Sequence, residues 1–287
     1  MRVEERPLAP LRVEERPLAP VRVEERPLAA ASRDPRRDPG LETPLRGAST
    51  RTKATPVAGT VRCVTMHALP DEAADGGPPA LRLPFDMAVL DHRPLRTERM
   101  VLRPLAPSDA DDVWEYQRLP EVLRYIPWPV RDRGEAREHT ELRAGLRRLQ
   151  ADGDAVFLAM VLTGEPSTRE VAKGHPRPDR VVGDLMVRLG SLQHAQLEVG
   201  WVVHPDFQGR GLAGEAASVL LDLAFGRFAA HRVYAQLDAR NAASARLCER
   251  LGMRREATLL EEEYNDGEWQ DTAAYGMLRR EWRRLRG

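Results

Sequence analysis

Residues 199–214 read Val-Gly-Trp-Val-Val-His-Pro-Asp-Phe-Gln-Gly-Arg-Gly-Leu-Ala-Gly, and this stretch decides the fold. A strand-like apolar run is followed by a short elbow, a glycine-rich turn and a helical pattern that begins near Leu212. Glycines at a strand-to-helix turn let backbone N–H groups approach a phosphate closely, and the positive end of the helix dipole favours that anion. The stretch therefore predicts a binding site for a phosphorylated ligand.

Composition divides the chain into two parts. Residues 1–96 hold 14 of the 23 prolines but only one of the 15 aromatic residues, Phe85. A segment so poor in large apolar groups cannot offset the entropy of ordering itself. We therefore expect residues 1–92 to be a disordered, low-complexity tail and residues 93–287 to form one folded domain.

The tail begins with three ten-residue repeats in residues 1–30. The unit Arg-Val-Glu-Glu-Arg-Pro-Leu-Ala occurs at residues 2–9, 12–19 and 22–29. This period matches no common solenoid, and the proline in each unit prevents a continuous helix. Three interpretations of the tail remain open: a low-complexity linker, sequence upstream of a later translation start, and a docking tail.

Charge and cysteine usage exclude several classes of function. The 44 basic and 44 acidic residues cancel, and no basic stripe carries interleaved aromatics, so nucleic acid is not an expected partner. No run of apolar residues is long enough to cross a membrane, and the N-terminus lacks the apolar core of a signal peptide, so we expect a cytoplasmic protein without membrane contact. The two cysteines, Cys63 and Cys248, predict neither a disulfide nor a metal site.

Hydrophobic periodicity in the domain predicts the order β-α-α-β-β-β-α-β-α-β-β. This order is typical of an α/β or α+β fold with a mixed sheet. In the second helix, Leu142, Leu146 and Leu149 would share one face. The predicted strands are residues 97–105, 155–162, 180–189, 196–203, 233–237, 254–262 and 269–278, and the predicted helices are residues 108–118, 132–150, 212–228 and 241–251. Residues 163–179 are predicted to be a polar loop.

The glycine turn is open to more than one interpretation. Gly209, Gly211 and Gly214 satisfy the G-x-G-x-x-G spacing of a dinucleotide-binding turn, and Asp238 ends the next strand where a ribose-binding acid would lie. However, four residues separate the strand from Gln208, whereas that fingerprint follows its strand directly. The turn also comes too late in the domain for the several parallel strands of a dinucleotide fold. A tight turn without any ligand is the simplest alternative.

The turn also resembles the signature of a known family. Gln208-x-x-Gly211-x-Ala213 is similar to the pyrophosphate-binding pattern Q/R-x-x-G-x-G/A of the GNAT superfamily of N-acetyltransferases. Residues 241–253 resemble the second cofactor-contacting helix of that family. Residues 97–105 and 267–282 resemble the branch that includes the ribosomal-protein N-terminal (alanine/serine) acetyltransferases. The resemblance covers about residues 93–286.

The resemblance implies a fold and a cosubstrate. The fold would have a mixed central sheet of about six to seven strands with about four flanking helices. The cosubstrate would be acetyl-CoA, with no metal, and its pantetheine arm would lie along the edge of the strand that ends at Val203. A bulge at Gly200 would open this edge. The implied cofactor-binding residues are Trp201, Val202, Val203, Gln208, Gly209, Arg210, Gly211, Leu212, Ala213, Gly214, Asn241 and Ser244.

Catalysis in this family needs a proton acceptor and a proton donor. Glu198 matches the position where many members place the general base. His204 lies in the elbow after the strand, where a local hydrogen bond is the expected role. The tyrosine that protonates the leaving thiolate in many relatives is replaced by Cys248, seven residues after Asn241. We expect Cys248 to be a small buried side chain rather than an acid.

The acceptor is expected to be an amine. Tyr125 and Trp128 lie in a loop that forms one wall of the acceptor groove in the family. Glu261, Glu262 and Glu263 would attract a cationic amine, or would simply protect an edge strand. The resemblance therefore implies acetyl transfer to a protein N-terminus, an aminoglycoside, a polyamine or another small amine, by a monomer or a homodimer. An idle acyl-CoA-binding module is the alternative, because the tyrosine is missing.

Overall fold

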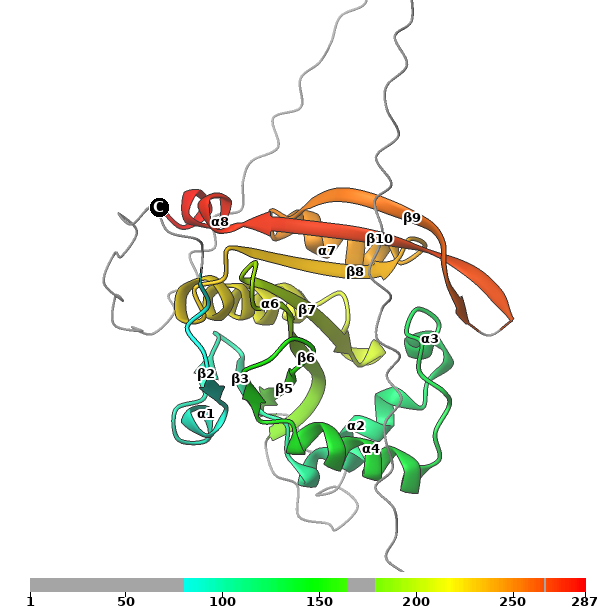
Figure 1. The fold of residues 1–287 in the computed structure, drawn as a ribbon. Helices are drawn as coiled ribbons and strands as arrows, with labels where there is room; N and C mark the ends of the chain where they lie inside the picture. The colour runs from blue at the N-terminus through cyan, green and yellow to red at the C-terminus, as the bar shows by residue number, and fades with distance from the viewer. Residues whose placement is uncertain (1–79, 165–178, 266) are drawn as a thin grey trace, which may run out of the picture. The chain divides into compact units, whose positions relative to one another are not determined.

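The computed structural model describes residues 80–164, 179–265 and 267–287. The first 79 residues of the predicted tail, with its repeats and Cys63, lie outside these ranges, as does most of the predicted loop at 163–179. The described residues form an eight-stranded sheet with helices packed on both faces, together with a small two-stranded sheet (Figure 1). The predicted α/β class with a mixed sheet is confirmed.

The large sheet has the strand order β2-β3-β5-β6-β7-β8-β10-β9. Neighbouring strands pair antiparallel except β7 and β8, which run parallel and are joined through a helical crossover. The strands are β2 (Leu95–Arg96), β3 (Met100–Pro104), β5 (Ala155–Thr163), β6 (Asp179–Ser191), β7 (Gln196–Val203), β8 (Arg232–Asp238), β9 (Arg254–Asn265) and β10 (Glu268–Leu278). The small sheet pairs β1 (Phe85–Asp86) with β4 (Arg148–Leu149).

Helices cover the sheet and follow most of the predicted pattern. They are α1 (Ala88–His92), α2 (Ala110–Gln117), α3 (Pro120–Leu123), α4 (Arg133–Gly145), α6 (Leu212–Asp222), α7 (Ala242–Arg250) and α8 (Arg279–Arg286). A π turn at Leu223–Arg227 continues α6, so the predicted helix at 212–228 is present with a wider last turn. β7 has the predicted bounds, and the other predicted strands are present with ends shifted by a few residues.

The two faces of the sheet carry separate apolar clusters. In β5, Leu158 and Met160 join the cluster that includes α6, whereas Ala159 and Val161 join the cluster that includes α2. Successive side chains of a strand point to opposite faces, so one apolar strand supplies both clusters. The central strands are therefore buried on both faces, whereas most of the edge strand β9 is exposed.

The folded part begins before residue 93, the boundary that composition predicts. Phe85, Met87 and Leu90 are buried, and the Phe85 ring meets the Phe228 ring edge-on at 4.7 Å. The backbone N–H of Arg82 also donates to the Phe228 carbonyl at 2.8 Å. A composition averaged over 96 residues conceals this short apolar group, because one aromatic residue is enough to anchor it.

The prediction of a single helix through residues 132–150 is wrong in its last part. The helix α4 ends at Gly145, and Leu149 belongs to β4, where it pairs with Phe85. Leu142 and Leu146 are exposed at 58% and 49%, so the predicted apolar face is not the buried one. The buried face carries Ala136, Thr140, Arg143 and Ala144. Small residues on this face bring α4 close to its neighbours, and helical spacing alone could not distinguish the two faces.

Candidate active site

The site is an opening between β7 and β8. Their pairing stops at Glu198 and Tyr234, and beyond this point no described strand pairs with the β8-facing edge of β7. Unpaired backbone N–H and C=O groups require partners, so such an edge can bind an extended polar chain. The residues along this part of β7 are the predicted cofactor contacts Trp201, Val202 and Val203.

The opening comes from the divergence of β8, and the predicted bulge at Gly200 is absent. The register between β6 and β7 is continuous past Gly200, and its only shift lies between Leu189 and Ser191. A Cβ at Gly200 would lie 3.2 Å from the terminal methyl group of Met186, which is closer than an ordinary contact. Glycine at this position therefore makes room for Met186 and does not bend the strand.

The glycine turn presents backbone donors at the start of α6. Gly209 and Gly211 have φ values of +71° and +79°, in the left-handed region that favours glycine. The N–H of Glu215 donates to the Gly211 carbonyl at 3.1 Å, closing a helical turn. The amides of Leu212, Ala213 and Gly214 precede it and have no acceptor within the helix. The exposed residues 208–211 and these amides together can hold an anion.

Side chains fix the elbow between β7 and the turn. The Gln208 amide group donates to the Val203 carbonyl at 3.0 Å. Nδ1 of His204 accepts a hydrogen bond from the Asp206 N–H at 3.1 Å, as the local role for His204 predicted. Burial, and then the charge of Arg180, hold the pKa of His204 below its ordinary value. The Gln208 backbone N–H donates to the Pro205 carbonyl at 3.0 Å, so both the backbone and the side chain of Gln208 close the elbow.

Glu198 lies at the apex of the opening, where β7 and β8 part. It is buried, and Nε of Arg188 on β6 donates to its Oε2 at 2.9 Å, while the Arg188 Nη2 contacts the same oxygen. Tyr234 on β8 pairs in register with Glu198, and burial followed by the Glu198 charge raises the pKa of Tyr234. The predicted base is thus a carboxylate that is ion-paired with β6 and lies opposite a tyrosine of β8.

Asp184 on β6, the strand next to β7, is a second buried charge near the opening, and no sequence pattern predicted it. Asp184 on β6 pairs in register with Val202, and it accepts a hydrogen bond from the Tyr116 hydroxyl at 2.5 Å. Arg143 of α4 contacts the other oxygen of Asp184, and its guanidinium lies over the Phe157 ring at 4.3 Å. Burial, and then the Asp184 charge, raise the pKa of Tyr116 well above its ordinary value. The group connects α2 and α4 to the strand that backs the opening.

Three predicted cofactor residues meet at the start of α7. The Trp201 Nε1–H donates to the Ser244 hydroxyl at 3.2 Å, which joins β7 to α7. The Asn241 side-chain oxygen accepts from the Ser244 N–H at 3.0 Å and caps the helix. The cofactor role of Asn241 stays a prediction beside this cap.

The predicted acceptor residues are half-buried in the segment after α3. Trp128 packs edge-on against His139 of α4 with ring centroids 5.4 Å apart, and the Arg143 guanidinium lies 5.4 Å from its ring centroid. Tyr125 lies beside the Arg124 guanidinium at 5.3 Å. Burial lowers the pKa of His139 to about 4, and nearby arginines add to this effect. Trp128 is therefore linked through Arg143 to the buried Asp184.

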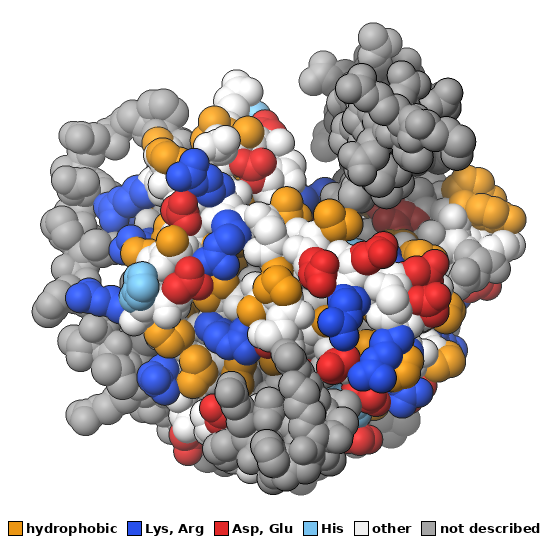
Figure 2. All heavy atoms as spheres, turned by 90° about the horizontal axis from the view of Figure 1, so that it is seen from below, with side chains coloured by type: hydrophobic (Ala, Val, Ile, Leu, Met, Phe, Trp, Pro, Cys, Tyr) orange, Lys and Arg blue, Asp and Glu red, His pale blue; other side chains and the backbone are white. Residues whose placement is uncertain are grey.

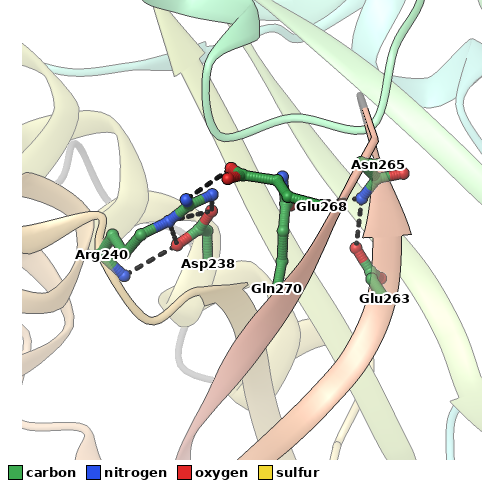
Figure 3. Close-up of polar contacts among 6 residues, drawn as sticks. All are labelled: Asp238, Arg240, Glu263, Asn265, Glu268 and Gln270. Carbon is green, nitrogen blue, oxygen red and sulfur yellow. Dashed lines mark hydrogen bonds and ion pairs between the residues drawn. The ribbon is translucent and has the colours of Figure 1, made fainter.

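Asp238, the candidate ribose-binding acid, is bound by an arginine. Arg240 contacts the Asp238 carboxylate at 2.7 Å and Glu268 at 2.7 Å, and so lies between the two acids (Figure 3). Burial alone would raise the pKa of Asp238, but hydrogen bonds from Arg240 lower it below its ordinary value. The large sheet also has a single parallel pair, β7–β8. Both findings disagree with a dinucleotide fold.

The three glutamates of the last hairpin lie on β9, the edge strand of the large sheet. The Glu261 N–H donates to Asp271 at 2.9 Å, and Glu263 accepts from the Asn265 side chain at 3.3 Å (Figure 3). Glu261 has a φ of +50°, and the strand pairing is irregular near Asp271. Such distortion protects an edge strand from pairing with another chain, so both predicted roles for these acids remain open.

Cys248 occupies the position that a tyrosine holds in many relatives, and it is buried. Its exposed fraction is 0%, and it belongs to the main apolar cluster with Met253 and Met277. Burial raises the pKa of its thiol to about 12. The environment agrees with the predicted packing role.

Three further properties of the described residues concern surface charge, membrane spans and metal ligands. On the face in Figure 2, basic and acidic side chains both lie among apolar ones, with several acidic side chains close together towards the right of the view. Within the described ranges, no helix is long and apolar enough to cross a membrane. The same residues contain no cluster of three or more His, Cys, Asp or Glu side chains suited to a metal ion.

Comparison with known proteins identifies the family. A family model described as "Acetyltransferase (GNAT) domain" matches residues 99–254, more than half of the chain. The uncharacterized N-acetyltransferase YnaD of Bacillus subtilis (strain 168) is 27% identical over 188 residues, which cover 66% of this chain and 98% of YnaD. The crystal structure of a GNAT-family acetyltransferase from Bacillus anthracis has a TM-score of 0.53 and 26% identity, covering 64% of this chain and 98% of that one. The chain belongs to the GNAT family and is an N-acetyltransferase.

The predicted branch of the family has weaker support. The ribosomal L7/L12 alpha-N-protein acetyltransferase RimL, in complex with coenzyme A, has a TM-score of 0.50 and is 16% identical, covering 63% of this chain and 94% of RimL. At this identity the likeness shows a shared fold alone. The finding supports the GNAT architecture and leaves the amine acceptor open.

Proposed function

We propose that this chain transfers the acetyl group of acetyl-CoA directly to a primary amine. The observation that carries the proposal is the continuity of the opening with the glycine turn. The turn at Gly209 and Gly211 offers free amides for a pyrophosphate, and the unpaired edge of β7 leads from there back to Glu198. A pantetheine arm along Trp201–Val203 would direct the thioester towards this apex.

The chemistry assigns one role to each part of the site. The amine nitrogen attacks the thioester carbonyl, a C–N bond forms, the C–S bond breaks, and coenzyme A leaves as a thiolate. A backbone N–H on the β7 edge would stabilise the negative charge that develops on the carbonyl oxygen. Glu198 would accept the proton of the amine, directly or through water. Because Cys248 lies in the apolar core, we assign no acid to the thiolate.

The acceptor side of the proposal involves Tyr125 and Trp128. Their half-buried rings follow α3 and precede α4, and the contact of Trp128 with Arg143 ties this segment to the sheet. We propose that they line the acceptor groove. The acceptor class includes a protein N-terminus, as the resemblance to the ribosomal-protein branch suggests, and small-molecule amines.

The test incubates the full chain with acetyl-CoA and a panel of peptides and small amines. Thiol release and mass spectrometry of the acceptors measure the transfer. We expect at least one amine to gain an acetyl group. Stabilisation by acetyl-CoA without transfer to any acceptor would favour the idle acyl-CoA-binding module.

A further inference from the structure

Arg99, in the turn between β2 and β3, contacts the glycine turn although it lies 111 positions earlier in the sequence than Arg210. Its Nη1 donates to the Arg210 carbonyl at 2.8 Å. Its backbone N–H and Nε donate to the two carboxylate oxygens of Glu215 at 2.9 Å and 2.8 Å. One residue therefore contacts the backbone of the turn and the first turn of α6.

The contact with the Arg210 carbonyl orients a donor. In a trans peptide the C=O and the following N–H point in opposite directions. When Arg99 holds the Arg210 carbonyl, the N–H of Gly211 points away from Arg99. A Cβ at Gly211 would lie 3.5 Å from the Arg99 Nη2, so the guanidinium lies directly against the turn. The left-handed Gly211 is thus fixed with its amide directed away from the protein contact.

The contact with Glu215 neutralises a charge. A carboxylate in the first turn of a helix favours the helix but competes with an anionic ligand for the same dipole and amides. The Glu215 side chain is only 8% exposed, and its Oε2 lies 2.6 Å from the Arg99 Nη2. Burial alone would raise the pKa of Glu215, but hydrogen bonds from Thr97 and Arg99 lower it below its ordinary value. Glu215 is therefore ionised at neutral pH, with Arg99 as its counter-charge.

We propose that Arg99 is a positioning residue for the pyrophosphate of coenzyme A. It would act through the turn, by orienting the 210–211 peptide and by cancelling the Glu215 charge beside the anion site. The proposal rests on the proposed function, because it assumes that coenzyme A binds at this turn. Neither the glycine spacing nor the signature at Gln208 requires a partner from the β2–β3 turn.

The experiment measures coenzyme A binding to the full chain by calorimetry. We expect Arg99→Ala to weaken coenzyme A binding about 10-fold, because a charge-assisted contact is lost and a carboxylate is left unpaired near the anion. The affinity for pantetheine, which lacks the pyrophosphate, should change by less than about two-fold. Thermal shift measures this affinity. The value of kcat at saturating acetyl-CoA should stay within about three-fold, so that the loss appears in KM.

Two further variants separate positioning from simple loss of fold. Arg99→Ala combined with Glu215→Gln should recover only part of the affinity, because the uncompensated charge is gone but the contact with the Arg210 carbonyl is still missing. Arg99→Lys, which keeps the charge without the fork of donors, should lie between the wild type and Arg99→Ala. Arg96→Ala, an exposed arginine on the preceding strand, is the matched control and should bind as the wild type does.

The outcomes distinguish this proposal from the proposed function. Unchanged coenzyme A affinity in Arg99→Ala, or an equal loss of pantetheine binding, would overturn the positioning role while the function stands. If the wild-type chain does not bind coenzyme A at all, the proposed function fails, and the role of Arg99 fails with it. If Arg99→Ala does not fold, Arg99→Lys decides the question by the same comparison.

Discussion

The glycine turn and the apex of the opening are built from different chemistry. At the turn the donors are backbone amides of consecutive residues, 209–214, because the Gln208 N–H already donates to the Pro205 carbonyl. At the apex the polar groups are side chains from three strands, with Glu198 on β7, Arg188 on β6 and Tyr234 on β8. The turn depends on the backbone conformation of one segment, whereas the apex depends on side chains that three strands bring together. Substitutions at the turn should therefore weaken cofactor binding, and substitutions at the apex should slow catalysis.

The largest effect is expected for Gly211→Glu at the turn. The left-handed backbone disfavours a side chain there, and the new carboxylate would lie beside the proposed anion site. We expect the affinity for acetyl-CoA to fall by more than about 100-fold with the fold retained, because Gly211 is exposed. Calorimetry and far-UV circular dichroism measure the two properties.

Gly153→Glu is the control for this variant. Gly153 also has a positive φ, of +90°, and nothing lies within 4 Å of its Cβ position. The control introduces the same strain and charge away from the turn. Wild-type affinity in Gly211→Glu, or an equal loss in Gly153→Glu, would remove the pyrophosphate from the turn.

The next effect is expected for Glu198→Gln at the apex. The amide keeps the shape of the side chain but cannot accept the proton of the amine. We expect kcat to fall by about 100-fold with the KM for acetyl-CoA nearly unchanged, the typical size of a general-base contribution. Steady-state kinetics with the best acceptor measure both constants.

Glu256→Gln is the matched control for the apex. Glu256 on β9 is also ion-paired, with Arg232 and Arg254, but it lies outside the opening. The kcat of Glu256→Gln should equal that of the wild type. A fall of less than about three-fold in Glu198→Gln would assign Glu198 to the ion pair alone.

His139 gives a smaller, pH-dependent effect on stability. Its pKa in the folded chain is about 4, below its ordinary 6.5, so between these pH values the unfolded chain binds a proton that the folded chain does not. The free energy of unfolding should therefore fall as the pH drops from about 6.5 to about 4, by about 1 kcal/mol once partial exposure is discounted.

Urea unfolding at pH 7 and pH 5 measures this change. His139→Gln should lose part of the pH dependence of the wild type. Equal pH dependence in His139→Gln and the wild type would show that His139 titrates normally.

The smallest effect on catalysis is expected for Cys248→Ala. The thiol is buried with a pKa raised to about 12, so we expect kcat and its pH profile to stay within about three-fold of the wild type. The variant should lose about 1 kcal/mol of stability from the cavity it leaves in the core. A fall in kcat above about ten-fold with an altered basic limb would make Cys248 the missing acid.

The same contrast explains what the sequence could predict. The strand at 196–203, the glycine turn and the helix at 241–251 depend on neighbours in the chain, and local pattern predicted all three. The Asp184 group with Tyr116 and Arg143 joins three distant elements, so no spacing could reveal it.

Sequence patterns also failed to predict α3 and α8 and placed Leu149 in the wrong element, because the local sequence carries too little information there. The four-residue helix α3 is too short for a periodic pattern. The charged helix α8 has no buried residue to mark one of its faces. Leu149 matched a helical period by chance and belongs to a strand, because its partner Phe85 comes from a segment assigned to the tail.

Hydrogen exchange of the full chain with and without coenzyme A tests the central claim most directly. The account predicts that coenzyme A slows amide exchange in peptides covering residues 199–203 and 208–214, because these backbone groups would bind the arm and the pyrophosphate. The edge strand β9, residues 254–265, should exchange at the same rate in both states. Bound coenzyme A without protection at 208–214 would contradict the account.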